Sequence, residues 1–257
     1  MSTDLRTRVL PDYEALGAAA ADLVAAKLRE KPHAVFMVPT GTTPLVMYRR
    51  LVGMREREDL SFARATFFNL DEYLGLPPNY PASYHVYMRE NFYGLVDVDP
   101  GRVHVPDGAA PDPAAECERY EREIRAAGGV DLCVLGIGRN GHIGFNEPGA
   151  SFDSRTRVVR LAESTRRVNA ADFEGDRAPE RAISVGMRTI SDSREVLLLA
   201  SGANKARAVA EAVRGKVSEA VPASALRLHP NASLLLDRDA ASELEGAAPG
   251  GEPGLTP

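Results

Sequence analysis

The feature that most constrains the fold of this chain is a regular alternation of short apolar runs with longer amphipathic segments. Short apolar runs bounded by polar or proline-containing loops are typical of buried strands, and the segments between them have helical spacing. Such alternation forms a mostly parallel sheet with helices on both faces. We therefore predict a Rossmann-like, three-layer α/β/α fold. Strands are predicted at 33–38, 65–70, 130–135, 156–161, 181–185, 196–201 and 233–236, and helices at 12–30, from 44 onward, and at 82–92, 113–126, 163–171 and 203–214.

The length of 257 residues fits one large domain, which we place at residues 1–245. Residues 246–257 are rich in Gly, Pro and Ala and are predicted to form a disordered tail. The net charge of −5 argues against nucleic-acid binding, which usually needs a basic face. No apolar run approaches membrane-spanning length and the amino terminus has no signal core, so we expect a cytoplasmic protein without a membrane partner.

The strongest chemical signal lies in the glycine-rich segment 136–148, which follows the predicted strand 130–135 and reads GIGRNGHIGFNEP. It places an imidazole, His142, and a carboxylate, Glu147, beyond the carboxyl end of a strand, where ligands bind in folds of this class. A histidine held by a carboxylate suits proton transfer near neutral pH. The alternative is that the histidine is structural.

The same segment satisfies the pattern G-x-G-x-x-G, which marks dinucleotide-binding loops. That pattern carries weight only where a helix begins within the loop and points its amino terminus at a pyrophosphate. Here Gly144 and Pro148 oppose a helix. The sequence therefore disfavours a nicotinamide cofactor.

Two other loops offer an anion-binding site. Gly41, Thr42 and Thr43 connect a predicted strand to a helix that opens at Pro44, so amides, hydroxyls and the helix dipole could hold a phosphate. The same residues could simply begin the helix, with Thr43 as N-cap and Pro44 in the first position. Lys205 follows another predicted strand and could add positive charge to that phosphate, although a lone lysine there is usually only solvated.

Two adjacent carboxylates, Asp71 and Glu72, follow the apolar strand 65–70. Adjacent residues of an extended chain point to opposite sides, so one of the two carboxylates faces the buried side. One interpretation is a turn or helix cap. The other is a general base whose pKa is raised by burial. No spacing of His, Cys, Asp and Glu in the sequence resembles a metal site.

Taken together, these segments resemble the glucosamine-6-phosphate deaminases. The resemblance runs in matching order over roughly residues 30–245, and its central motif is long and specific. The matching stretches are PTGTTP (39–44), NLDEYLGL (69–76), SYH (83–85), GIGRNGHIGFNEPG (136–149), SRTRV (154–158), SGANKA (201–206) and PASAL (222–226).

The resemblance implies conversion of glucosamine 6-phosphate and water to fructose 6-phosphate and ammonia, with no cofactor. It implies that Asp71 relays a proton between C2 and C1, supported by its neighbour Glu72. It also implies that His142 assists opening of the sugar ring and that Glu147 orients His142. The residues implied to hold the phosphate are Gly41, Thr42, Thr43 and Lys205.

The chain departs from the family pattern at three places. Asn140 stands where many members have Asp, although another branch has Asn. Ala171 stands where a phosphate-binding Arg is usual; Arg167, one helical turn earlier, is our candidate for its replacement. The end of the chain resembles the shorter, unregulated branch, which favours a monomer or small homo-oligomer.

Two other functions remain open at this point. A 6-phosphogluconolactonase would share the fold, but its related loop lacks the Phe-Asn-Glu-Pro continuation and the Asn-Leu-Asp-Glu-Tyr motif. A non-catalytic sugar-phosphate sensor would usually carry a helix-turn-helix, for which the beginning of this chain leaves no room.

Overall fold

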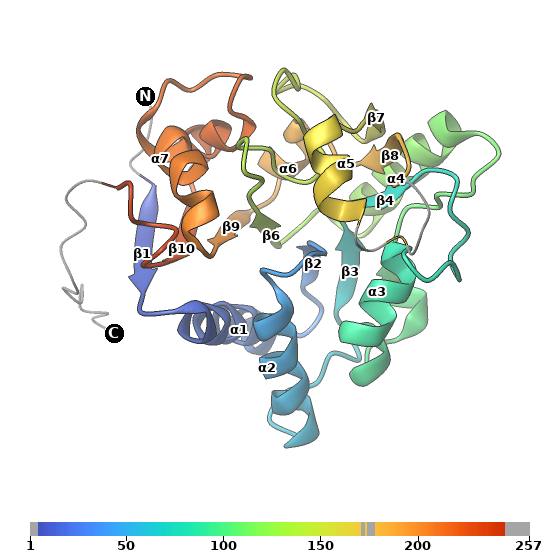
Figure 1. Ribbon diagram of the computed structural model, residues 1–257. Coiled ribbons are helices and arrows are strands. Elements are labelled where there is room, and N and C mark those ends of the chain that lie inside the picture. The colour runs from blue at the N-terminus through green and yellow to red at the C-terminus, as the bar shows by residue number, and fades with distance from the viewer. Residues whose placement is uncertain (1–4, 171–172, 174–177, 245–257) are drawn as a thin grey trace.

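The computed structural model describes residues 5–170, 173 and 178–244. Its centre is a seven-stranded sheet in the order β1-β10-β9-β6-β2-β3-β5, and every neighbouring pair is parallel (Figure 1). The predicted mostly parallel α/β fold is confirmed. The strands are β1 (Arg6–Leu10), β2 (Val35–Val38), β3 (Thr66–Asn69), β5 (Val103–His104), β6 (Leu132–Gly136), β9 (Glu195–Ala200) and β10 (Ala232–Asp237).

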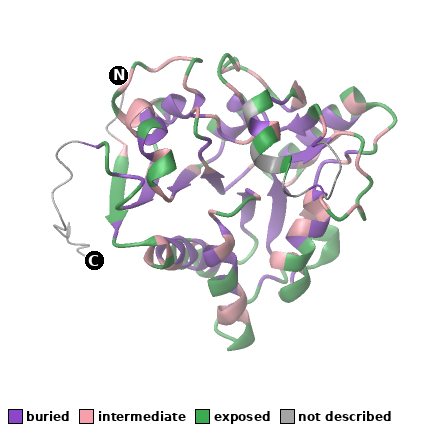
Figure 2. Cartoon of the chain, in the orientation of Figure 1, coloured by how far each residue is buried: buried purple, intermediate pink, exposed green. Residues whose placement is uncertain are grey.

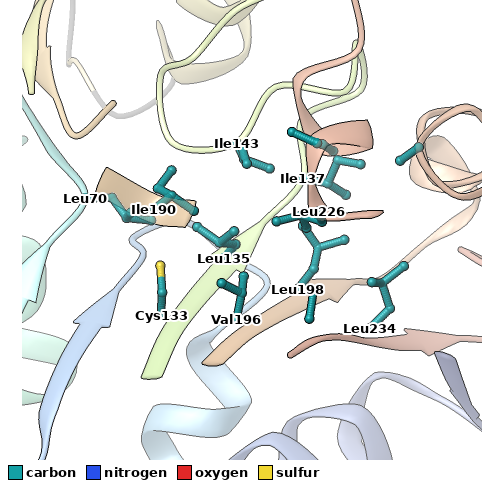
Figure 3. Close-up of a cluster of buried hydrophobic side chains, with 14 of the residues drawn as sticks. Leu70, Cys133, Leu135, Ile137, Ile143, Ile190, Val196, Leu198, Leu226 and Leu234 are labelled. Atoms are coloured by element: carbon teal, nitrogen blue, oxygen red, sulfur yellow. The ribbon is translucent and has the colours of Figure 1, made fainter. Parts of the chain in front are cut away.

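Alternate side chains of the central strands enter two separate hydrophobic cores, one on each face of the sheet. On one face Phe36 and Val134 pack with residues of α1 (Tyr13–Glu30), α2 (Leu45–Glu56) and α3 (Tyr84–Asn91). On the other face Met37 and Leu135 pack with residues of α4 (Pro113–Ala126), α6 (Met187–Ser191) and α7 (Ala206–Arg214). Figure 3 shows Leu135 and Ile190 in this second core. The central strands are thus buried on both sides (Figure 2), which explains their continuous apolar sequence.

The helices begin where polar side chains satisfy free backbone amides. Asp12 accepts from Ala15 N at the start of α1, and Ser83 accepts from Val86 N at the start of α3. Such caps typically stabilise a helix by about 1 kcal/mol. The start of α2 differs from the expectation, because Pro44 is its N-cap residue and no side chain caps it.

A second, three-stranded antiparallel sheet adjoins the first, in the order β4-β8-β7. Its strands are β4 (Asp71–Tyr73), β7 (Arg157–Arg160) and β8 (Arg181–Ser184). We had expected the strands near 156–161 and 181–185 to belong to one mostly parallel sheet. The half-buried side chains of β7 explain the difference, because a central parallel strand would be buried on both faces.

Leu70 joins the two sheets. Its N–H donates to Val38 O of β2 (3.3 Å), and its carbonyl accepts from Val185 N, directly after β8 (2.8 Å). The chain therefore leaves the large sheet at Asn69 and enters the small one at Asp71.

The remaining described elements are α5 (Glu163–Asn169) and 3-10 turns at Tyr93–Leu95, Pro100–Arg102, Ala203–Lys205 and Pro222–Leu228. The helix expected at 203–214 thus opens with a 3-10 turn. The predicted tail at 246–257 lies outside the described residues. Within the described part of the chain, no helix has the length and apolar character needed to cross a membrane.

Candidate active site

The loops that carry the predicted site residues follow four consecutive strands of the large sheet. In the order β9-β6-β2-β3, the first three strands are followed by Lys205, the segment 140–147 and the segment 41–43, and β3 is followed by Asp71 at the start of β4. Because parallel strands end at the same edge, the carboxyl ends of these four strands lie side by side (Figure 1). The topology thus brings the predicted residues together at one edge of the large sheet, where its strands have their carboxyl ends. We call this edge the rim.

An asparagine links the histidine and the glutamate. Asn140 Oδ1 lies 2.7 Å from His142 Nδ1, and Asn140 Nδ2 donates to Glu147 Oε2 at 2.7 Å. The direct separation between His142 Nδ1 and Glu147 Oε2 is 3.5 Å. Asn140 therefore lies between the two groups in the hydrogen-bonded chain.

This arrangement assigns the protons on the imidazole. An ionised carboxylate only accepts hydrogen bonds, so the amide NH2 of Asn140 faces Glu147 and its oxygen faces the ring. The ring nitrogen that contacts this oxygen must donate, which places a proton on Nδ1. Nε2 of His142 is then the nitrogen that can accept or return a proton.

Glu147 is held as a carboxylate by its neighbours. Burial alone would raise its pKa, but the neighbouring His142 and the hydrogen bonds from Thr165 and Asn140 lower that pKa to about 2. Thr165 Oγ1, from α5, donates to Glu147 Oε1 at 2.5 Å. Thr165 was not selected from the sequence, because it is separated from Glu147 by eighteen positions.

A tight turn fixes the position of the imidazole. Gly138 N donates to His142 O (2.9 Å), and Gly141 N donates to Gly138 O (3.0 Å). A Cβ built on Gly138 would lie 2.2 Å from the His142 ring. Gly141 has φ +82, a conformation that favours glycine. The glycines therefore serve close packing of the ring on the backbone, not the approach of a pyrophosphate.

Asp71 is 5% exposed and faces the histidine loop. A Cβ built on Gly144 would lie 3.5 Å from Asp71 Oδ2, so the carboxylate packs against a glycine two positions after His142. Burial, and to a lesser extent the charge of Glu72, raises the pKa of Asp71 to about 8. A buried carboxyl with a pKa near neutrality suits a general base.

Glu72 points elsewhere and has a structural role. Its carboxylate accepts from Tyr73 N (2.7 Å) and from His85 N (3.2 Å) in the first turn of α3. Burial raises its pKa to about 7, against the lowering effect of these bonds. Glu72 therefore ties β4 to the start of α3 and acts on Asp71 through its charge.

The loop at 39–43 is anchored by its carbonyls and leaves its amides free. Among the described residues, the N–H groups of Gly41, Thr42 and Thr43 donate no hydrogen bond. Three tyrosine hydroxyls, one each from α1, α2 and α3, donate to carbonyls of the loop. The pairs are Tyr13 with Thr42 O, Tyr48 with Pro39 O (2.5 Å) and Tyr87 with Gly41 O (2.6 Å).

Lys205 is half-buried and has no acidic partner among the described residues. Burial, and then the charge of the nearby Arg139 guanidinium, lower its pKa. Arg139 was not among the residues selected from the sequence, although it belongs to the central motif. The two cations thus follow neighbouring strands, β6 and β9, and neither has a carboxylate partner among the described residues.

The structure does not bring Arg167 to this site. Its side chain is 78% exposed and pairs with Glu163, one turn earlier on α5. Arg167 lies two residues after Thr165, which is about 200° around the helix axis from the side chain that contacts Glu147. Ala171, from which its role was inferred, lies outside the described residues. No group of three or more His, Cys, Asp or Glu side chains that could hold a metal ion occurs among the residues described.

Comparisons with known proteins agree with the motifs. The sequence model of the family "Glucosamine-6-phosphate isomerases/6-phosphogluconolactonase" matches residues 11–235. A glucosamine-6-phosphate deaminase of Halothermothrix orenii is 48% identical over 241 residues, covering 93% of this chain and 100% of the relative. Glucosamine-6-phosphate deaminase 1 of Bacillus subtilis is 49% identical over 231 residues, covering 90% of this chain and 96% of the relative.

Solved structures show the same likeness. A monomeric glucosamine-6-phosphate deaminase has a TM-score of 0.91 and 47% identity, covering 93% of this chain and 100% of that one. The 6-phosphogluconolactonase of Trypanosoma brucei has a TM-score of 0.75 at 21% identity, covering 95% of this chain and 100% of that one. The second likeness shows the fold alone.

Proposed function

This chain belongs to the family of glucosamine-6-phosphate isomerases and 6-phosphogluconolactonases, and we propose that it is a glucosamine-6-phosphate deaminase. The reaction converts glucosamine 6-phosphate and water to fructose 6-phosphate and ammonia. The observation that carries the proposal is the packing of the Asp71 carboxylate against Gly144, two residues from His142. This contact supports a role for Asp71 as a buried base close to the loop that carries His142.

The proposed reaction begins with opening of the sugar ring. The O1 hydroxyl gives up its proton as the C1–O5 bond breaks, and His142 Nε2 exchanges protons with these oxygens. The hydrogen bond from Nδ1 to Asn140 holds the ring in the tautomer that leaves Nε2 as the reacting nitrogen. Glu147 fixes Asn140 in the orientation that makes this possible.

The second stage is a proton shift along the open chain. Asp71, once ionised, removes the proton from C2, the electron pair forms the C1–C2 double bond of an enolamine, and the former aldehyde oxygen takes up the proton that the 2-ammonium group loses. The protonated carboxyl then returns the proton to C1, and the resulting C2 imine adds water and releases ammonia. One carboxyl group serves for both transfers because its raised pKa makes it both a usable base and a usable acid.

Two observations support the deaminase over a lactonase. The relatives named as deaminases are 42–49% identical, whereas the lactonase structures are 16–24% identical. A lactonase also needs no base for a C–H bond, so it gives no reason to bury a carboxyl with a raised pKa at position 71.

We further propose that the protein acts as a monomer. The solved deaminase that is 47% identical to this chain is described as monomeric. The proposed steps are proton transfers that side chains supply, so the proposal invokes no cofactor. A phosphorylated amino sugar is charged and does not cross a bilayer unaided, so we place the reaction in the cytoplasm.

The test is ammonia release from glucosamine 6-phosphate, galactosamine 6-phosphate and unphosphorylated glucosamine, with hydrolysis of 6-phosphogluconolactone measured in parallel. We expect turnover of the first substrate and a loss of about 10²–10⁴-fold in kcat for Asp71→Asn. Circular dichroism should show that this variant is folded. Lactone hydrolysis without ammonia release would reject the deaminase, and sugar-phosphate binding with no turnover would favour a sensor.

A further inference from the structure

Arg139 and Lys205 form a pair of cations that the proposed catalytic steps leave unused. Arg139 is exposed and Lys205 is half-buried. Neither has a carboxylate within ion-pair distance in the described part of the chain. The closeness of Arg139 contributes to the lowered pKa of Lys205, after burial. Two like charges brought together without a counter-charge are unfavourable unless an anion binds between them.

The strand order shows where such an anion would bind. Arg139 follows β6, Lys205 follows β9, and the loop at 41–43 follows β2. β6 lies between β9 and β2 in the sheet. A phosphate held by Lys205 on one side and by the free amides of Gly41, Thr42 and Thr43 on the other would therefore lie directly above the turn that carries Arg139.

The turn itself is rigid enough to present the guanidinium. It is closed by the bond from Gly141 N to Gly138 O and extended by the bond from Gly138 N to His142 O. Arg139 occupies the second position of this turn, and its neighbour Asn140 holds His142 and Glu147. The same turn thus connects the anion side of the rim with the proton-transfer side.

We propose that Arg139, together with Lys205, binds the phosphate of the substrate and so selects phosphorylated over unphosphorylated amino sugars. The inference rests on the proposed function for the identity of the sugar, but its anion chemistry can be tested without turnover. Arg139 supplies the guanidinium that the sequence led us to expect from Arg167, whose side chain is exposed and pairs with Glu163.

The experiment compares Arg139→Ala, Arg139→Lys and Arg57→Ala. Arg57 is a matched control, because it is an exposed arginine paired with Asp59 at the end of α2 far from the rim. Binding of inorganic phosphate and of fructose 6-phosphate is measured by calorimetry, and KM and kcat are measured with glucosamine 6-phosphate.

We expect Arg139→Ala to raise the Kd of both phosphate ligands and the KM roughly tenfold or more, as for a lost charged hydrogen bond. The value of kcat should change by less than about threefold, since uniform binding is lost. Arg139→Lys should recover part of the loss. Constants within about twofold of wild type for Arg139→Ala, or an equal effect in Arg57→Ala, would overturn the inference.

A second measurement tests the closeness of the two charges without any ligand. Removing the Arg139 guanidinium should raise the pKa of Lys205, read from the pH dependence of its acylation by mass spectrometry. An unchanged pKa would overturn the pairing. If ammonia release fails but Arg139→Ala still weakens phosphate binding, the reaction is rejected and the anion site stands.

Discussion

A Cβ atom on Gly138 would lie 2.2 Å from Nδ1 and Cε1 of His142, so the imidazole occupies the space that any other residue at position 138 would fill. We expect Gly138→Ala to displace the ring from Asn140 and to lower kcat at least about 10²-fold. The measurement is steady-state ammonia release. Gly53→Ala is the control, because the nearest atom to its Cβ would be the end of a flexible Arg57 side chain at 3.5 Å. Wild-type activity in Gly138→Ala would show that the position of His142 is not critical.

The titration of Asp71 should set the acid limb of the pH profile. Its pKa is raised to about 8 by burial and then by the charge of Glu72, and the proposed base acts only when ionised. We expect kcat/KM to rise with pH through this group. Glu72→Gln removes the neighbouring charge and should move the acid limb to lower pH. A limb that stays in place in this variant would assign the titration to another group.

The same shift affects stability. The unfolded Asp71 side chain ionises near its ordinary value of 3.8, whereas the folded one keeps its proton until about pH 8. Between these values the folded state binds more protons, so the free energy of unfolding falls as pH rises. Asp71→Asn lacks this dependence and should gain stability relative to wild type from pH 4 to pH 8. Urea unfolding at both pH values tests this sign.

Thr165 should stabilise the ionised form of Glu147. Thr165→Val removes the hydrogen bond to Oε1, whereas Thr165→Ser keeps a hydroxyl. The pKa of Glu147, lowered to about 2, should rise in the valine variant, and the stability linked to that shift is present above about pH 4.5 and lost as pH falls through 2. We expect Thr165→Val to lose about 1.5–3 kcal/mol of unfolding free energy at pH 7. Thr165→Ser should stay close to wild type.

Three tyrosine hydroxyls hold the loop at 39–43, and removing one of them should weaken substrate binding with little effect on the catalytic step. Tyr13→Phe removes the hydrogen bond to Thr42 O and frees the backbone whose amides face the rim. We expect KM for glucosamine 6-phosphate to rise about two- to tenfold with kcat nearly unchanged. Thermal unfolding should show that the fold is intact. A change in kcat with constant KM would contradict a role in holding the anion loop.

The sequence predicted the five inner strands of the large sheet, because they are buried on both faces and are therefore apolar throughout. It did not predict the edge strands β1 and β5. It did not predict the small sheet. The residues of β7 and β8 look like ordinary strands, and their choice of antiparallel partners depends on contacts between distant segments. β4 was also missed, because a single residue, Leu70, separates it from β3.

The site shows the same limit. The glycine motif, the carboxylates after β3 and the lysine after β9 were found because chemistry at the carboxyl ends of strands can be read locally. Partners that reach the site from elsewhere were not found, such as Tyr13, which is 29 positions from Thr42. The interpretation of Arg167 assumed a helix face that the contact between Thr165 and Glu147 does not support.

The peptide at Leu70 has one further consequence. The carboxylate of Asp71 lies on β4 of the small sheet, the imidazole of His142 lies in the loop after β6 of the large sheet, and Leu70 is hydrogen-bonded to both sheets. Their spacing therefore depends on how the two sheets meet, at Leu70 and where Asn146 Nδ2 donates to Val185 O directly after β8 (2.8 Å), so a slight shift of one sheet against the other would alter the reach of the aspartate without altering any residue beside it. Substitutions that alter the packing where the two sheets meet, remote from the sugar, should lower catalytic activity as effectively as changes at the rim.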